Sequence, residues 1–267
     1  MSIECRAAHR ALHPFVIGFV ERPGAIVAGA LLQLPFAIPV IHIVLDEAEG
    51  PGVAVSGGTK LARTMAARSL PHSFVIALGF GGVALLSPGP ASAAAGGFVE
   101  VEDTFWRALR QRMRDAPDFA TRVAIAEHML MGRIGAQGVV SSPLFKAADA
   151  IAHDRWSGPI RELARKCGIE ERTLRNRFRH DLGWSPKRLL RVARFNRALR
   201  TLHPRPWSGR PVREARLEFF DDAHFYREFR AHAGISPAAF SAAKQCSGDA
   251  MLHNLALQAG ASTPSPS

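Results

Sequence analysis

Residues 168–186, GIEERTLRNRFRHDLGWSP, place arginines at the spacing of a helix. At about 100° per residue, Leu174, Phe178 and Leu182 fall on one stripe of that helix. The second stripe consists of Arg172, Arg175, Asn176 and Arg179, at positions i, i+3, i+4 and i+7. The pattern predicts a helix with one face in a core and one face that binds an anion, although a solvated basic face has the same appearance.

The charge distribution separates the two halves of the 267-residue chain. Residues 1–154 hold 13 Lys and Arg against 13 Asp and Glu, whereas residues 155–267 hold 21 against 10. The whole net charge of +11 therefore lies in the last 113 residues, where most of the cations are arginines. Arginine forms bidentate contacts with phosphate and with guanine, so this half is expected to meet a polyanion. A membrane surface fits this arginine-rich composition less well than nucleic acid does.

Two features of the sequence bear on the compartment. Cys5, Cys167 and Cys246 show no paired spacing, which indicates neither a zinc site nor a disulfide framework. Residues 25–45 are uncharged and long enough to span a bilayer. Pro35 and Pro39 interrupt this segment, and its β-branched end VIHIVL predicts a strand. Without a signal-peptide pattern, the expected location is the cytoplasm.

The first half of the chain is predicted to be rich in strands. Short apolar runs separated by Pro, Gly and acidic turns extend from about residue 14 to residue 102, with helical periodicity only near residues 60–69. Residues 103–135 then fit two amphipathic helices joined near residues 116–119. We therefore expect a barrel-like β domain with two helices over residues 1–141, which serves effector binding or dimerisation.

The second half is predicted to be helical. Ser142-Pro143 offers an N-cap followed by proline in the first turn, and residues 186–202 fit one long helix. Around that helix the sequence repeats at an offset of 51 residues. Ala164, Leu174, Phe178, Arg179, Gly183, Ser185 and Pro186 recur as Ala215, Phe225, Phe229, Arg230, Gly234, Ser236 and Pro237. Such a repeat marks a duplicated supersecondary unit.

These motifs resemble those of the AraC/XylS family of bacterial transcription regulators. The similarity covers about residues 143–244 and rests on Gly168, on Leu174 and Phe178, on the G-x-S-P of residues 183–186 and on the AHFYREFRAHAGISP of residues 223–237. The family fold implies an all-α domain over residues 142–247, in which two helix-turn-helix units are joined by a long helix. Inside the second unit, the turn just before residues 223–237 departs from the family pattern at Phe219 and Phe220. Residues 248–267 are expected to be a disordered tail.

The resemblance also implies which residues bind DNA. The predicted DNA-facing set is Arg172, Arg175, Asn176 and Arg179 in the first unit and Ala223, Tyr226, Arg227 and Arg230 in the second. The predicted structural core of the units is Ala164, Gly168, Leu174, Phe178, Pro186, Phe225, Phe229 and Pro237. Because a helix fits the major groove, where arginine binds guanine and asparagine binds adenine, the chemistry agrees with these positions.

The resulting prediction is an α+β two-domain protein that acts as a sequence-specific transcription regulator. Its expected partners are double-stranded DNA, RNA polymerase, a small-molecule effector and a second copy of the chain, with no membrane, cofactor or metal. His42 and His72 are interpreted as structural histidines. The alternatives are an enzyme with an appended DNA-binding module, for which no catalytic constellation is found, and a non-specific basic protein. The operator, the effector and the choice between activation and repression stay open.

Overall fold

The structure, a computed structural model, describes residues 3–13, 15–26, 30–46, 52–66, 69–87, 92–137, 142–153, 155–202, 222–237 and 239–240. Two predicted features lie outside these ranges. They are the tail over residues 248–267 and the turn at Phe219 and Phe220, which differs from the family pattern. Within the described part of the chain, no helix combines the length and apolar character needed to cross a membrane.

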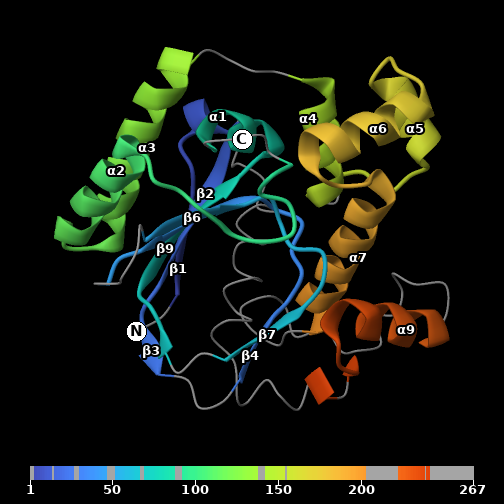
Figure 1. Cartoon of the computed structure of the whole chain (residues 1–267), viewed down its shortest axis with the longest axis horizontal. Coiled ribbons are helices and arrows are strands. Elements are labelled where there is room, and N and C mark those ends of the chain that lie inside the picture. Colours follow the sequence, from blue (N-terminus) through green and yellow to red (C-terminus); the bar gives the residue numbers. More distant parts are fainter. Residues whose placement is uncertain are drawn as a thin grey trace.

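A six-stranded antiparallel sheet forms the centre of the N-terminal half (Figure 1). Its strands, in spatial order, are β1 (Glu4–Ala7), β2 (Val16–Arg22), β9 (Ser73–Leu78), β5 (Val40–Val44), β6 (Val53–Ser56) and β10 (Val99–Glu100). Two short ladders accompany it, formed by β3 (Ala25–Ile26) with β8 (Ser69–Leu70) and by β4 (Ala30–Gln33) with β7 (Arg63–Ala66). The uncharged segment 25–45 thus contributes strands, as predicted.

The alternation of side chains along the strands divides the sheet between two cores. In β9, Phe74, Ile76 and Leu78 belong to one apolar cluster, while Val75 and Ala77 belong to another. Because successive side chains of a strand point to opposite faces, each cluster covers one face of the sheet. Both faces are therefore buried, which explains why SFVIAL reads as an unbroken apolar run rather than as an alternating one.

The first cluster is closed by helices on one side of the sheet. These are α2 (Thr104–Asp115) and α3 (Phe119–Gln137), with the 3-10 turn η1 (Arg10–Leu12) and α1 (Phe80–Leu86) alongside. The two predicted amphipathic helices are confirmed, including the break between residues 115 and 119. Figure 1 shows α2 and α3 side by side on the left of the sheet.

The sequence-based assignment of secondary structure was wrong at two places in this half. Residues 80–86 form α1 where apolar strands were expected, and residues 63–66 form the strand β7 where a weak helical period was noted. A short apolar run does not distinguish a strand from a buried helix turn. In the structure, α1 packs closely against the chain at Phe15, since a Cβ at Gly82 would lie 2.1 Å from the carbonyl oxygen of Phe15.

In its described residues, the C-terminal half is helical. They are α4 (Pro143–Ala152), α5 (Ile160–Lys166), α6 (Glu171–Leu182), α7 (Pro186–Leu202) and α9 (Asp222–Ala233). The side chain of Ser142 accepts a hydrogen bond from the amide of Leu144 at 3.2 Å, so the predicted N-cap of α4 is confirmed. The long helix over residues 186–202 is also confirmed.

The second face of the sheet shares its core with these helices. One apolar cluster contains Val40 and Phe80 of the N-terminal half together with Phe178, Leu182 and Trp184 of the C-terminal half. Burying apolar surface in a shared cluster stabilises both partners at once. The two halves therefore do not have independent cores along this face.

Trp184 is the centre of this contact. Its indole is fully buried and donates its N–H to the carbonyl oxygen of Gly57 at 2.8 Å. The ammonium group of Lys60 lies 5.5 Å from the centre of the ring system. A Cβ at Gly58 would come within 2.9 Å of the indole, so the glycine allows the ring to lie directly against the backbone. The Gly57–Gly58 pair forms a socket for Trp184.

Among the described residues, three further hydrogen bonds join the halves. Asn196 in α7 donates to the carbonyl oxygen of Pro35 at 2.7 Å, and the amide of Ala62 donates to the carbonyl oxygen of His232 at 3.0 Å. Asp149 in α4 accepts from the amide of Phe80, at the first turn of α1, at 2.9 Å. These bonds involve α4, α7 and α9, so the β half contacts the helical half along its length (Figure 1).

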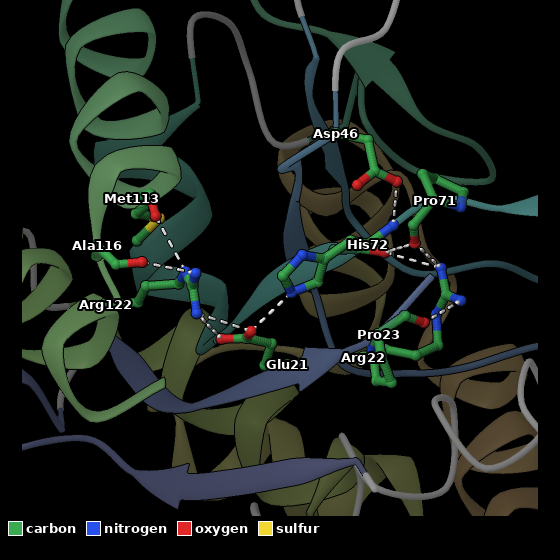
Figure 2. Close-up of polar contacts among 10 residues, drawn as sticks. Glu21, Arg22, Pro23, Asp46, Pro71, His72, Met113, Ala116 and Arg122 are labelled. Atoms are coloured by element: carbon green, nitrogen blue, oxygen red, sulfur yellow. Dashed lines mark hydrogen bonds and ion pairs between the residues drawn. The ribbon is translucent and has the colours of Figure 1, made fainter. Parts of the chain in front are cut away.

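A buried ionic cluster ties α3 to the sheet (Figure 2). The carboxylate of Glu21 in β2 accepts hydrogen bonds from Arg122 in α3 at 2.9 Å and from His72 at 2.7 Å. Arg122 also donates to the carbonyl oxygens of Met113 and Ala116, which end α2. Glu21 and Arg122 are almost fully buried. Each compensates the charge of the other, and an unpaired charge would be costly in the interior.

We expect the substitution Trp184→Ala to lower the free energy of unfolding by about 3–5 kcal/mol, since it empties a core position and removes the donor to Gly57. Urea unfolding followed by far-UV circular dichroism measures this loss. The matched control is Trp156→Ala, because Trp156 is only partly buried and bonds locally to Gly158. Equal losses from the two substitutions would contradict the central role of Trp184.

Asp149 predicts a pH dependence of stability. Burial raises the pKa of its carboxyl group to about 7, although the amide of Phe80 and the charge of Arg155 work against this rise. The unfolded value is close to 4, so between about pH 4 and pH 7 the folded state binds more protons than the unfolded state. The free energy of unfolding should therefore fall as pH rises through that window.

The substitution Asp149→Asn keeps an oxygen acceptor and removes the titration, so it should abolish this part of the fall in stability. Thermal unfolding between pH 4 and pH 8 tests it. Asp103→Asn is the control of opposite sign, because hydrogen bonding to Arg133 holds the pKa of Asp103 below its usual value. That variant should lose stability almost evenly between pH 4 and pH 8, because the lowered pKa places the titration of Asp103 below pH 4. An unchanged pH profile in Asp149→Asn would refute the assignment.

Candidate nucleic-acid interface

Helices α5 and α6 form a complete helix-turn-helix unit. Gly168 in the turn adopts a positive φ of 68°, which favours glycine, and the amide of Ile169 donates to the carbonyl oxygen of Ala164 at 3.1 Å. These bonds close the end of α5 and reverse the chain into α6. The predicted turn position of Gly168 thus corresponds to the observed geometry.

The inward face of α6 holds the unit together. Leu174 and Phe178 are fully buried, and they share a cluster with Leu163 and Ala164 of α5. The helix ends at Gly183 in the left-handed conformation, with its amide bonded to the carbonyl oxygen of Arg179 at 3.1 Å. A side chain at Gly183 would also collide with Ala95, since a Cβ would lie 2.4 Å from it. Both the end of α6 and its inward phase are therefore specified by packing.

The outward face of α6 carries the predicted basic stripe. Arg172, Asn176 and Arg179 are exposed, and Arg175 is partly exposed. The four side chains line one shallow surface hollow together with Glu171. Among the described residues, Arg172 and Arg179 form no ion pair. The stripe therefore presents positive charge and hydrogen-bond donors that the protein itself leaves largely unneutralised.

Two ion pairs with i,i+4 spacing lie on α6, one within this stripe and one beside it. Arg175 bonds to the carboxylate of Glu171 through Nε at 2.8 Å and through Nη2 at 2.5 Å. Arg177 approaches Asp181 with an Nε–Oδ2 distance of 3.4 Å. Both pairs have the i,i+4 spacing in which an acid and a base on a helix meet. Of the two acids, Glu171 lines the hollow and Asp181 does not.

Helix α9 repeats the division between an inward and an outward face. Phe225 and Phe229 are fully buried in a cluster with Phe195 of α7. The predicted DNA-facing residues of this helix are all exposed, and they are Ala223, Tyr226, Arg227 and Arg230. Residues 203–221, where the family pattern predicts the preceding helix of a second helix-turn-helix unit, are outside the described ranges. The described part of the second unit is therefore α9 and the turn after it.

The turns after α6 and α9 are built alike. Gly183 has a φ of 67° and Gly234 a φ of 74°. The following serines cap the next segment, with Ser185 accepting from the amide of Arg188 at 3.3 Å and Ser236 accepting from the amide of Ala239 at 3.1 Å. The next residues, Pro186 and Pro237, are both buried. The 51-residue repeat in the sequence is therefore a repeat of structure.

Helix α7 fixes α9 through an ion pair. Arg191 donates to Glu228 through Nε at 2.9 Å and through Nη2 at 2.8 Å. Burial tends to raise the pKa of Glu228, but hydrogen bonding to Arg191 lowers it overall. Two parallel bonds constrain the orientation of both side chains. Since α7 also carries Asn196, which bonds to Pro35, the helix connects both units to the β half.

The surroundings of His42 and His72 in the β half fit a structural role. His72 bonds to Glu21, and burial lowers the pKa of His42 to about 4, with the charge of Arg22 adding to the shift. His42 is therefore neutral near pH 7. In the ranges that the structure describes, no group of three or more His, Cys, Asp or Glu side chains could hold a metal ion.

Sequence reasoning missed three residues that organise this region. Glu171 and Glu228 each hold an arginine, and Trp184 anchors the first unit. The i,i+4 spacing of Glu171 and Arg175 was a usable local signal. The pairing of Arg191 with Glu228 and the socket for Trp184 join residues far apart in the chain, so no local pattern could reveal them.

The chain was compared with known proteins. A crystal structure of an apo ToxT variant from Vibrio cholerae strain SCE256 aligns with 90% of this chain and 96% of its own, at 6% identity and a TM-score of 0.37. This similarity is too low to carry an argument, and no curated protein matches the sequence. Residues 163–243, which span α5 to α9, match a family described as a helix-turn-helix domain. That match identifies a helix-turn-helix domain over residues 163–243.

Proposed function

We propose that the protein is a sequence-specific transcription regulator that reads DNA bases mainly through α6. The observation that carries this proposal is the exposed stripe of α6, whose arginines and asparagine stand on a helix that a packed core holds in place. A helix of this kind fits the major groove of B-DNA. Specific binding needs fixed side-chain positions, and the buried inward face supplies them.

The roles of the side chains follow from their donors and acceptors. Arg172 and Arg175 can donate two parallel hydrogen bonds to the O6 and N7 atoms of guanine. Asn176 can donate to N7 and accept from N6 of adenine. Arg179 lies one turn further along α6 and is assigned to the phosphate backbone, which positions the helix without reading sequence.

The second unit is proposed to contribute affinity more than specificity. Helix α9 has Ala223 and Tyr226 where α6 has Arg172 and Arg175. Its remaining cations, Arg227 and Arg230, are therefore assigned to phosphates. Helix α7 has 17 residues and is therefore about 25 Å long. This spacing suits two helices that enter neighbouring major grooves, about one turn of DNA apart.

The β half is proposed to regulate this reader. We assign residues 1–141 to effector binding or dimerisation and residues 142–247 to DNA binding. A small organic molecule, a second copy of the chain and RNA polymerase are the proposed further partners. The shared core and the Trp184 socket support control, because a change in the sheet would be transmitted directly to the end of α6.

The proposal predicts different effects for two arginine substitutions. Arg175→Ala should relax the preference for one base pair by about 1–3 kcal/mol, since it removes a base contact. Arg230→Ala should weaken binding to all sequences and reduce the slope of log affinity against log salt by roughly one, since it removes a phosphate contact. Affinities for a selected site and its single-base variants, measured at several salt concentrations, distinguish the two. Equal loss of discrimination from both substitutions would show that the units read DNA alike.

A further inference from the structure

Glu171 stands among the proposed base-reading residues and is the one acid there. It is the first residue of α6 and lines the same hollow as Arg172, Arg175, Asn176 and Arg179. A carboxylate on a DNA-facing surface is repelled by phosphates, so its presence lowers general affinity. At the first turn of α6 the carboxylate also interacts favourably with the helix dipole, so a role in recognition has to be distinguished from this stabilising one.

The contact between Glu171 and Arg175 has a particular geometry. The single oxygen Oε1 of Glu171 accepts from both Nε and Nη2 of Arg175, at 2.8 Å and 2.5 Å. The side chains of Arg175 and Glu171 are 40% and 38% exposed, so the pair is open to a ligand. The carboxylate thus occupies the edge of the guanidinium formed by Nε and Nη2.

The occupied edge determines which donors of Arg175 remain. A guanidinium carries five N–H groups in one plane. With one Nε–H and one Nη2–H directed at Glu171, the other Nη2–H and the two Nη1–H groups are left. The end-on edge between Nη1 and Nη2 presents two parallel donors, which match the adjacent acceptors O6 and N7 of guanine. Adenine presents one acceptor beside a donor in the same groove and does not match.

We infer that Glu171 is a positioning residue that directs Arg175 end-on toward a guanine and so determines specificity at one base pair. This inference rests on the proposed function of α6. Holding the arginine in one orientation before DNA binds removes part of the entropy cost of ordering it in the complex. In the second unit the equivalent of Arg175 is Tyr226, so this arrangement belongs to the first unit.

A structural salt bridge is the simpler explanation that the experiment must separate. Exposed i,i+4 pairs contribute little to stability. Arg177 and Asp181 form a pair of the same type on the same helix, outside the hollow. Asp181→Asn makes the same change of charge in an i,i+4 pair of the same helix and serves as the control. Asp181 differs from Glu171 in a second contact, with His180 at 2.8 Å, and in its place near the C-terminal end of α6.

The test uses the full-length protein and double-stranded DNA. Sites are first selected from a random duplex library with the wild-type protein, and affinities are then measured for the best site and its single-base variants. The proteins compared are the wild type, Glu171→Gln, Asp181→Asn, Arg175→Ala and the double variant Glu171→Gln/Arg175→Ala. Thermal unfolding of each protein reports any effect on the fold.

We expect Glu171→Gln to lose roughly tenfold discrimination at one guanine, within the range of a bidentate base contact. Arg175→Ala should lose discrimination at the same guanine, and the double variant should lose no more than Arg175→Ala. Asp181→Asn should discriminate as the wild type does. Glu171→Gln should be slightly less stable than Asp181→Asn, because the helix dipole favours an acid in the first turn of α6 and disfavours one in the last turn. This set of results separates positioning from a general effect of charge.

Two results would overturn the inference while the proposed function stands. Either Glu171→Gln discriminates as well as Asp181→Asn does, or it loses discrimination at a base pair that Arg175→Ala does not affect. A wild-type protein that selects no site from the library has a different meaning. In that case the proposed function fails, and the inference fails with it.

Discussion

The burial of Trp184 against Gly57 and Gly58 is the contact on which the arrangement of the two halves depends. Residues 57 and 184 are far apart in the chain, and the hydrogen bond between them links the end of α6 to the sheet. The same helix end includes Gly183, which leaves no room for a side chain beside Ala95. The orientation of the basic stripe is thus set by the β half as well as by the helix-turn-helix unit.

This coupling gives the β half a physical means to control DNA binding. Any movement of the segment around Gly57 would have to move Trp184, break its hydrogen bond or open its pocket. Asp149, Asn196 and His232 add further bonds across the same boundary. Because packed interfaces change between discrete arrangements rather than deform continuously, such a boundary suits a two-state response.

On α6, the residues that stabilise the helix differ from those that are proposed to bind DNA. Its inward residues, Leu174 and Phe178, are buried in the shared core, while its outward arginines add repulsion and little stability. Glu171 and Asp181 each offset one arginine on the helix itself. The helix is therefore held by packing, and its exposed face is available for recognition.

The sequence by itself determined the features that depend on local spacing. Helical periodicity predicted α2, α3, α7 and the inward phase of α6, and the 51-residue repeat predicted the matching turns at Gly183 and Gly234. The exposure of Arg172 and Asn176 followed from that phase. These features are readable because side chains three or four positions apart share a helix face.

Only the tertiary structure decided the rest. The helix α1, the strand β7, the ionic cluster of Glu21 and Arg122, and the socket for Trp184 depend on partners far away in the chain. An apolar run has the same local pattern as a strand or as a buried helix turn, and an isolated charge does not reveal its partner. Contacts that folding creates between distant segments select among these possibilities, so they could not be inferred before the fold was known.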